Sequence, residues 1–415
     1  MPWLFSPTLP TFYFFAAISI YLGLLSLRGG VRFVRYLQSE LTKDYPEFTP
    51  FVTVFMPLRG VDDGLKDNIA AVFAQDYPRY EVLFVSGEET DPAWRVVGAA
   101  RQSFAAEAGP TMQSVIAGPA TDTGQKVHNL SVAINKAHPN SEIFVFVDSD
   151  ARVSSGWLRS LVAPLRDETI GATTGYRWFI PVRGGLASHL QSVWNASIAS
   201  ALGPDGAKNF CWGGSTAIRR ATFDNCKVIE RWRGTVSDDF AMTRALQDAG
   251  LPIKFVPQCL TPSFEDCSLG ELVEFTARQL KITRAYAAHL WKAVLFGSAI
   301  FVVTFFGGLL LVLARATTSR SFATPLFLLL IMFTMGAMKS HLRLRAVASV
   351  IQDARISTFN STLAHVTLWP LASALYFYNA LAAAISRRIT WRGITYELKS
   401  PNETVIMRDD NSDRV

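Results

Sequence analysis

The feature that most constrains this chain is a set of four long stretches without a charged residue. They are residues 1–27, 293–314, 321–338 and 356–386. An α-helix rises about 1.5 Å per residue, so about 20 apolar residues cross the roughly 30 Å hydrocarbon layer of a bilayer. The sequence therefore predicts an integral membrane protein that contacts the lipid bilayer.

Basic residues beside these stretches predict the orientation of the chain. Arg28, Arg32 and Arg35 follow the first stretch, whereas a secretory signal peptide carries its positive charges before the apolar run. Basic residues also follow residues 321–338, and membrane proteins keep such loops in the cytoplasm. We therefore expect an uncleaved N-terminal anchor, a cytoplasmic domain, and then a pair of helices that runs out and back.

The last stretch is ambiguous because His365, Pro370 and Asn379 interrupt it. A single crossing would place the basic residues after it outside, against the positive-inside tendency. It either crosses or returns around Pro370. The expected divisions are an anchor and basic linker over 1–47, a catalytic domain over 48–290, a membrane region over 291–390 and a polar tail over 391–415.

Residues 48–290 alternate short β-rich runs with helical ones. Strands are expected over 51–60, 80–89, 112–118 and 143–150, and helices over 64–75, 93–106 and 129–137. The strands are nearly continuous apolar runs, as in parallel sheets that are buried on both faces. This pattern predicts a doubly wound α/β domain, in which ligands bind at the carboxyl ends of the strands.

Charge and cysteine content exclude several classes of protein. The net charge of +6 is too small to indicate a nucleic-acid partner, and most of the basic excess lies beside apolar runs. Four cysteines without a C-x-x-C pair indicate a reducing compartment and no zinc site.

The strongest chemical signal is Asp148-Ser149-Asp150, directly after the apolar run IFVFV. Two carboxylates at the end of a buried strand can hold Mg²⁺ or Mn²⁺ together with substrate phosphates. A nucleotide-sugar donor supplies such a diphosphate. The alternative is an ordinary Asx turn.

Two further groups are candidates. In Ser237-Asp238-Asp239, Ser237 or Asp238 caps a helix, or an acid at the helix start provides a base that deprotonates an incoming hydroxyl group, and both can hold together. Arg278, Lys281 and Arg284 fall along one side of a helix, where they either neutralise a leaving diphosphate or contact anionic headgroups.

Taken in order, these runs resemble the ceramide glucosyltransferase family, membrane-bound glycosyltransferases. The matching runs are PLRGVDDGLKDNI (57–69), QDYPRYEVLF (75–84), TDPA (90–93), QKVHNL (125–130), VDSDARV (147–153), SDDFAMTRAL (237–246), RQLKI (278–282) and TWRGITYEL (390–398).

The resemblance implies a GT-A fold that transfers a sugar, glucose first among them, from a UDP-sugar to a lipid hydroxyl group with inversion. It implies Asp148 and Asp150 as metal ligands, Asp239 with Asp238 as the base, and Arg278 and Lys281 as cations for the departing UDP. It also places Lys126 and Asn129 near the donor and Glu88 at uracil. A cytoplasmic catalytic domain on a bacterial inner membrane is the expected location.

Three positions depart from the family pattern: Glu88 replaces Asp, Lys281 replaces Arg, and Ile282 replaces Trp. Lysine keeps the charge but lacks the planar fork of arginine. Three alternatives therefore stay open: a hopanoid or other lipid as acceptor, a processive polysaccharide synthase, and an inactive membrane scaffold.

Overall fold

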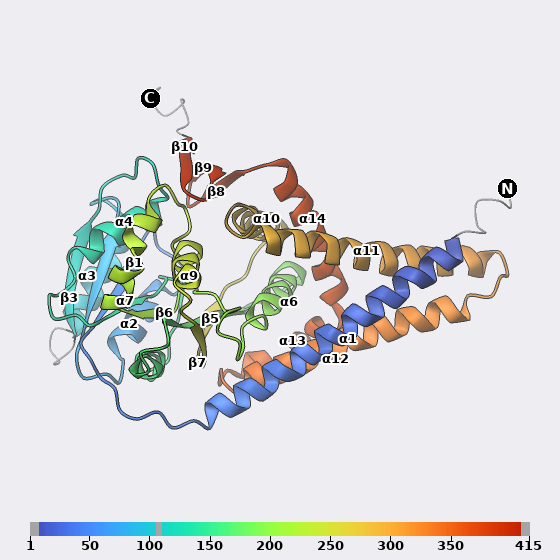
Figure 1. Ribbon diagram of the computed structural model, residues 1–415, viewed down its shortest axis with the longest axis horizontal. Helices are drawn as coiled ribbons and strands as arrows, with labels where there is room; N and C mark the ends of the chain where they lie inside the picture. Colours follow the sequence, from blue (N-terminus) through green and yellow to red (C-terminus); the bar gives the residue numbers. More distant parts are fainter. Residues whose placement is uncertain (1–7, 105–109, 408–415) are drawn as a thin grey trace.

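The computed structural model describes residues 8–104 and 110–407 and contains an α/β domain with a long helical arm (Figure 1). A seven-stranded sheet forms the centre of the domain, with strand order β3-β2-β1-β4-β6-β5-β7. β6 runs antiparallel to both of its neighbours, and the other pairs are parallel. The expected α/β domain with apolar helices at both ends is confirmed.

The first four strands lie where the apolar runs predict them. They are β1 (Val52–Pro57), β2 (Tyr80–Ser86), β3 (Thr111–Ile116) and β4 (Ile143–Phe146). β1 pairs in parallel with β2 on one side and β4 on the other, and β1, β2 and β4 are buried on both faces. This burial explains why these strands read as continuous apolar runs.

Helices α2 (Leu65–Phe73), α3 (Ala93–Phe104) and α4 (Gln125–Ile134) connect these strands. α4 begins four residues before the start of the predicted helix 129–137 and ends three residues before its predicted end. Its first turn is polar in sequence, so the apolar period does not reveal it. Val127 and Leu130 are nevertheless fully buried against the sheet.

The second half of the domain completes the sheet and surrounds its edge with helices. The strands are β5 (Ala172–Ile180), β6 (Thr216–Arg219) and β7 (Ile253–Phe264). The helices are α5 (Trp157–Val162), α6 (Leu186–Ala199), α7 (Arg220–Asn225), α8 (Val228–Trp232), α9 (Asp238–Asp248) and α10 (Leu269–Tyr286), with 3₁₀ turns at Ala163–Arg166 and Ala354–Ser357.

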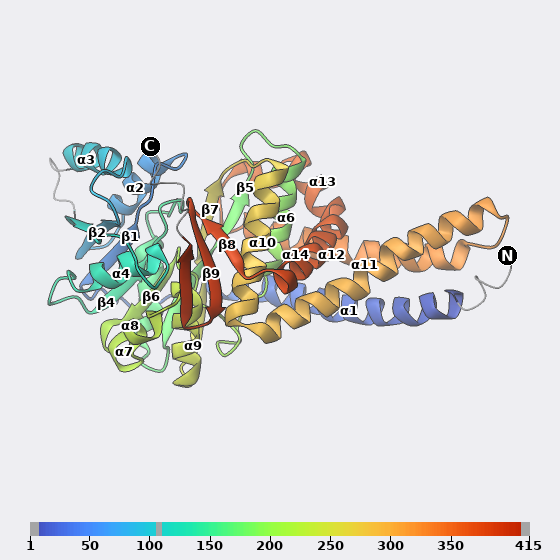
Figure 2. The same cartoon turned by 90° about the horizontal axis from the view of Figure 1, so that it is seen from above.

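Three long helices form the arm: α1 (Thr8–Leu41), α11 (Ala288–Thr317) and α12 (Ala323–Ala348). Each contains a window apolar enough to cross a membrane, with mean hydropathies of 1.6, 2.4 and 1.5. In Figures 1 and 2 the start of α1 and the connection between α11 and α12 lie together at the far end of the arm. The arm therefore has the geometry expected for one entering helix and one out-and-back pair.

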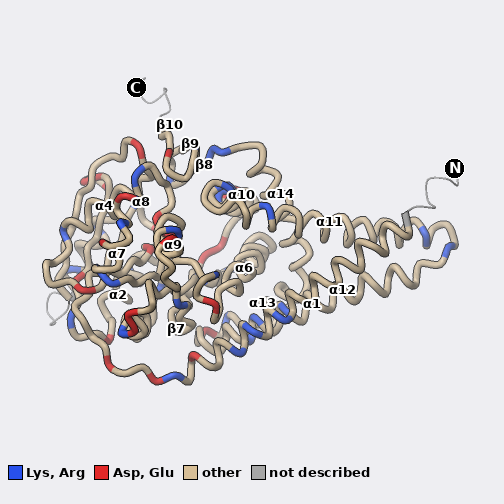
Figure 3. Tube along the Cα trace, in the orientation of Figure 1, with Lys and Arg blue, Asp and Glu red and all other residues tan. Residues whose placement is uncertain are grey.

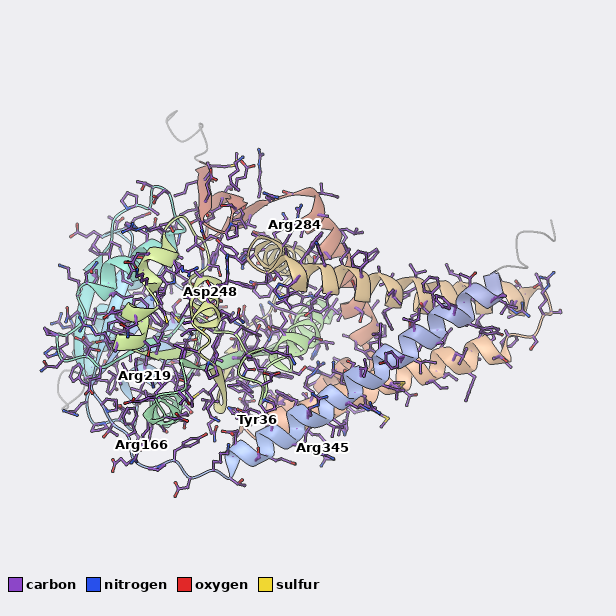
Figure 4. The ribbon with its side chains drawn as sticks, in the orientation of Figure 1. Tyr36, Arg166, Arg219, Asp248, Arg284 and Arg345 are labelled. Atoms are coloured by element: carbon purple, nitrogen blue, oxygen red, sulfur yellow. The ribbon has the colours of Figure 1, made fainter. Side chains whose placement is uncertain are left out.

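Charge divides the arm along its length. Figure 3 shows a central part almost free of charge, with basic residues toward the domain on α1 and α12 and a few more at the far end. Lys339 of α12 donates a 2.7 Å hydrogen bond to Ser26 of α1 and so joins the two helices. At its domain end, α1 is fastened to β7 because the Tyr36 hydroxyl (labelled in Figure 4) donates to the Phe255 carbonyl at 2.6 Å.

The ambiguous stretch forms α13 (Phe359–Thr367) and α14 (Trp369–Ile385), bent by 56° at Leu368. α13 packs against α6 and α12, and α14 packs against α6, α10 and α11. The pair passes across the base of the arm, beside the domain, and not along the arm (Figures 1 and 2).

Residues 388–407, which include the described part of the expected polar tail, form an antiparallel sheet instead, and residues 408–415 lie outside the described residues. The strands of this sheet are β8 (Arg388–Trp391), β9 (Ile394–Ser400) and β10 (Glu403–Met407). Ile389, Tyr396 and Leu398 are buried against Val236, Ile282 and Tyr286 of the domain. These alternating apolar residues give the segment a core face, which is why it folds onto the domain.

Candidate functional site

The carboxylates after β4 lie in a cluster of opposite charges. Lys126 Nζ lies 2.7 Å from Asp148 Oδ1, and Arg177 of β5 lies 3.4 Å from Asp148 Oδ2 and 3.2 Å from Asp150 Oδ2. Arg177 also stacks over the ring of Trp212, 5.0 Å from its centroid. Two strands and one helix start thus bring two acids and two bases to one edge of the sheet, at the carboxyl end of β4.

Asp238 joins the cluster through Lys126. The distance from Lys126 Nζ to Asp238 Oδ1 is 3.2 Å. A Cβ on Gly213 would lie 2.6 Å from Asp238 and 2.7 Å from Lys126, closer than side-chain contacts allow. The glycine of the Cys211–Ser215 loop therefore makes room for this ion pair.

The cluster sets the charge state of its members. Burial alone would raise the pKa of Asp148, but Lys126 and Arg177 outweigh it and lower that pKa. Burial raises the pKa of Asp238 to about 6, against the opposing charge of Lys126. Burial also raises the pKa of Glu265 to about 7, and the nearby charge of Asp150 adds to this. Carboxylates with opposite shifts in so small a space are typical of functional sites.

One oxygen of the pair is suited to a cation. Asp150 Oδ1 is buried and has no hydrogen-bond partner among the described residues. Over residues 8–104 and 110–407, no group of three or more His, Cys, Asp and Glu side chains gathers as a metal site. Mg²⁺ and Mn²⁺ are commonly held by one or two carboxylates, with phosphates and water completing the shell. Asp148 and Asp150 therefore fit a divalent cation that binds together with a phosphorylated ligand.

At the start of α9, the capping interpretation is confirmed for Ser237, whose hydroxyl group accepts from the Phe240 amide. Asp239 Oδ1 accepts from that amide at 2.7 Å and also contacts the Ser237 hydroxyl group. The Asp239 side chain is partly exposed, whereas Asp238 is buried. The two acids therefore differ: Asp238 is buried and held by Lys126, whereas Asp239 is partly exposed at the helix start.

A cleft beside the cluster contains the two predicted donor residues Glu88 and Asn129. Its lining comes from the ends of β1 and β2 and the start of α4, and includes Arg59, Gly60, Glu88, Thr90, Gln125 and Asn129. Glu88 is exposed at the rim, while Asn129 is buried and accepts from Gln125 at 2.8 Å. The cleft and the carboxylate cluster both include the first turn of α4, so they are adjacent.

Asp91, within the TDPA run, has a structural role. It is buried and accepts hydrogen bonds from the Gly60 amide at 3.0 Å, the Ala93 amide at 2.9 Å and the Ser86 hydroxyl group at 2.7 Å. These bonds fix the rim of the cleft.

The basic residues of α10 lie along one side, as predicted, but they do not contact the carboxylates. Arg278 donates to the Thr390 carbonyl at 3.3 Å and stacks over Trp391, and Lys281 donates to the Arg388 carbonyl at 2.8 Å. Arg284, labelled in Figure 4, donates to the Ala383 carbonyl. Burial lowers the pKa of Arg278 to about 10; the charge of Glu274 opposes this shift, the charges of Arg177 and Arg392 add to it, and Asp150 opposes it least.

Ile282 does not face the site. It is buried with Val236, Tyr286 and Ile389 in the apolar layer between α10 and the β8–β10 sheet. The position at which the family pattern has Trp therefore lies in this apolar layer. An indole near Arg278 comes instead from Trp391.

Four charged residues of the site carried no signal in the sequence: Arg177, Arg392, Asp62 and Glu265. Arg392 pairs with both carboxylate oxygens of Asp62, and Ser149 donates to Asp62 at 3.1 Å. Asp62 and Arg392 lie within runs quoted for the resemblance, but nothing in their spacing connects residues 330 positions apart.

A profile of a known family matches nearly the whole chain. Residues 11–404 match the profile described as Glycosyl transferase family 21. Ceramide glucosyltransferase 3 of Caenorhabditis elegans is 21% identical over 249 residues, which cover 58% of this chain and 52% of the relative. A ceramide glucosyltransferase of Gibberella zeae is 28% identical over 143 residues, covering 32% and 26%. The matched segment thus spans about half or less of these relatives.

Solved structures show a distant likeness. A mannosyltransferase from Pyrobaculum calidifontis, in complex with GDP-Man and Mn²⁺, is 18% identical with a TM-score of 0.47, covering 89% of this chain and 98% of the other. Glucosyl-3-phosphoglycerate synthase from Mycobacterium tuberculosis, with Mn²⁺ and UDP, is 16% identical with a TM-score of 0.38, covering 60% and 87%. At these scores neither likeness bears on the donor or metal of this chain.

Proposed function

The chain belongs to glycosyl transferase family 21, and from this premise we propose that it transfers a sugar, glucose first among them, from a UDP-sugar to the hydroxyl group of a membrane lipid such as ceramide. The transfer is a single displacement with inversion at the anomeric carbon, and it depends on Mg²⁺ or Mn²⁺.

The observation that carries this proposal is the position of Asp148 and Asp150 between two cations and next to an open cleft. When bound there, a divalent cation neutralises the diphosphate that leaves with the nucleotide. The unpartnered Asp150 Oδ1 supports this assignment, because a buried carboxylate oxygen without a partner is costly unless a ligand satisfies it.

The cleft accommodates the nucleoside in this proposal. Glu88 at the rim of the cleft contacts uracil. The buried Asn129 and the side-chain amide of Gln125, which donates to it, line the floor of the cleft. Lys126 lies between the cleft and the carboxylates and contributes a positive charge near the diphosphate. The first turn of α4, shared by the cleft and the carboxylate cluster, supports this assignment.

Asp239 is the proposed base. Its partial exposure gives an acceptor hydroxyl group access, and the contacts from the Ser237 hydroxyl group and the Phe240 amide fix its orientation. Asp238, in contrast, is occupied by Lys126. Asp239 therefore takes the proton of the lipid hydroxyl group as that oxygen attacks the anomeric carbon, and Asp238 maintains the position of the helix start.

In this proposal, Arg278 and Lys281 of α10, next to β8, stabilise the departing UDP. Both hold carbonyl groups of β8, and Arg278 is within electrostatic range of Asp150. Their positive charges oppose the negative charge that develops on the leaving diphosphate.

The helical arm supports a lipid acceptor. α10 continues almost directly into α11, so the site stands next to the base of three helices that can cross a bilayer. We propose that the arm anchors the domain at the cytoplasmic face of a bacterial inner membrane. A lipid head at that surface can then meet a soluble donor.

The test is transfer with defined donors and acceptors. Membranes that contain the protein are incubated with Mn²⁺ and a panel of labelled UDP-sugars, with added ceramide or hopanoid, and labelled lipids are identified by mass. We expect one labelled glycolipid from the wild type, none from Asp150→Asn, and wild-type product from the control Asp224→Asn, an exposed aspartate on α7.

Each other outcome has a defined meaning. Unchanged turnover in Asp150→Asn rejects the metal assignment. A lengthening polymer identifies a polysaccharide synthase, and a labelled hopanoid changes the acceptor. If no donor labels any lipid and no UDP-sugar is hydrolysed, the proposed transferase is rejected in favour of a membrane scaffold.

A further inference from the structure

Arg392 adopts an unusual backbone conformation at the tip of the β8–β9 hairpin. Trp391 pairs with Ile394, so Arg392 and Gly393 form a two-residue turn, and both have positive φ, 52° and 79°. Such turns favour Asn-Gly or Gly-Gly, because positive φ is unfavourable for a residue with a long side chain. An arginine at this position indicates that its side chain is needed there.

The Arg392 guanidinium reaches from the hairpin to the loop after β1. It bonds to both carboxylate oxygens of Asp62, one of them at 2.7 Å. Asp62 also accepts from Ser149, the residue between the two proposed metal ligands. The Arg392 guanidinium is therefore connected to the segment that carries Asp148 and Asp150 through a single residue, Asp62.

The other side of the turn contacts the nucleotide cleft. Arg59 Nε donates to the Arg392 carbonyl at 2.8 Å, and Arg59 lines the cleft. The turn therefore lies between the cleft and the carboxylates. A nucleoside in the cleft and a cation at the carboxylates would be joined by a diphosphate that passes this turn.

The C-terminal sheet is held firmly enough to position the turn. The Tyr396 hydroxyl group accepts from the Gln125 amide at 3.2 Å, at the first turn of α4. Lys281 and Arg278 of α10 donate hydrogen bonds to two carbonyl groups of β8. The Arg392 side chain itself remains 40% exposed, so it can exchange partners while the backbone stays in place.

We propose that Arg392 is a ligand of the donor diphosphate, and that it exchanges Asp62 for phosphate oxygens when the donor enters. This inference rests on the proposed function. The planar fork that now binds two carboxylate oxygens matches two phosphate oxygens equally well. In the absence of donor, Asp62 compensates the charge of Arg392.

The test uses Arg392→Asn in the full-length, detergent-solubilised protein with Mn²⁺. This variant creates the preferred Asn-Gly turn and replaces the guanidinium and its aliphatic stem with a short amide, so the melting temperature is expected to stay equal or rise. UDP affinity, measured by calorimetry, is expected to fall roughly ten- to hundredfold, as for loss of a charged hydrogen bond. The matched control is Arg387→Asn, an exposed arginine of the same region whose side chain donates to the Lys399 carbonyl at 2.7 Å.

Asp62→Asn distinguishes two roles of Arg392: a ligand of the donor diphosphate, or a structural partner of Asp62 that holds the hairpin in place. If Asp62 competes with the donor for Arg392, its neutralisation leaves UDP affinity equal or increases it. If the pair only holds the hairpin in place, both variants weaken UDP binding alike, and the inference is overturned. Uridine, which has no phosphate, is expected to bind Arg392→Asn and wild type equally in competition assays.

The outcomes distinguish this inference from the proposed function. If the wild type binds UDP with Mn²⁺ and Arg392→Asn binds it equally well, only the role of Arg392 is overturned. An equal loss for uridine and UDP also overturns it, because the effect then lies in the nucleoside pocket. If the wild type binds no UDP, the proposed function fails and this inference fails with it.

Discussion

Lys126 Nζ lies 2.7 Å from Asp148 Oδ1 and 3.2 Å from Asp238 Oδ1. Burial alone would lower the pKa of Lys126, but the two carboxylates outweigh it and raise that pKa. This lysine joins the residue pair after β4 to the start of α9. The donor side and the base side of the candidate site are thus connected through a single ammonium group.

Replacing Lys126 with Met is expected to destabilise the protein. Removal of one partner of a buried ion pair leaves the other charge uncompensated, which costs about 3–5 kcal/mol. The loss should be smaller at pH 5.5 than at pH 8, because Asp238, with its pKa raised to about 6, can then take up a proton. Thermal unfolding in detergent at both pH values measures this.

Lys136→Met is the matched control, because Lys136 is exposed just beyond the same helix. An equal melting temperature for Lys126→Met and wild type at pH 8 would show that the ion pair does not hold the two elements together.

Asp239→Asn is expected to lose transfer and keep UDP binding. The amide preserves the contacts that orient the side chain but cannot take the proton of the acceptor hydroxyl group. Turnover should fall by at least roughly a hundredfold, the contribution usual for a general base. Turnover of labelled lipid and calorimetric UDP affinity are measured on the same preparation, and loss of UDP affinity would move this residue to the donor site.

Glu265 is expected to make stability depend on pH in the metal-free protein. Burial and the charge of Asp150 raise its pKa from the ordinary value of 4.5 to about 7. As pH rises from 4.5 to 7, the unfolded chain ionises this group before the folded protein does, so the folded state loses stability. Above pH 7 both states are ionised and the loss levels off.

The comparison is between wild type and Glu265→Gln in chelator, measured as melting temperature from pH 4.5 to 8. The variant's advantage over wild type should grow up to about pH 7 and then stay constant. The exposed Glu230→Gln is the control. A difference that is constant across this range would show that Glu265 ionises normally.

Ile282→Trp is expected to lower stability without creating an acceptor wall. The position is 6% exposed and packed between α10 and the C-terminal sheet, so an indole overfills it at a cost of about 1–3 kcal/mol. Ile282→Val removes one methylene group there and should cost about 0.5–1.5 kcal/mol. A stable Trp variant with changed lipid preference would show instead that the position reaches the acceptor.

Local patterns were sufficient to predict part of this structure. The uncharged stretches predicted the three long helices, and the apolar runs predicted β1 to β4. In β1, β2 and β4, burial on both faces leaves a direct mark on composition. Asp148 and Asp150 were proposed as metal ligands on the same kind of pattern, since they end such a run. The cap at Ser237 is likewise a local pattern that the structure confirms.

The rest required the tertiary structure. Antiparallel β6, the C-terminal sheet and the bend at Leu368 follow from packing against distant elements, and the segment expected as a tail carries a core face that only its neighbours reveal. The contact between Lys281 and the Arg388 carbonyl was likewise not visible in the sequence, because the position of β8 is set by long-range packing.

The sequence by itself determined which segments avoid water and where a buried strand ends in acids, since both depend on neighbours in the chain. Only the tertiary structure decided which charges face those acids. Arg177 comes from a strand 27 residues beyond Asp150, and Arg392 meets Asp62 across 330 residues. Coulomb energy depends on distance in space, and spacing along the chain does not encode that distance.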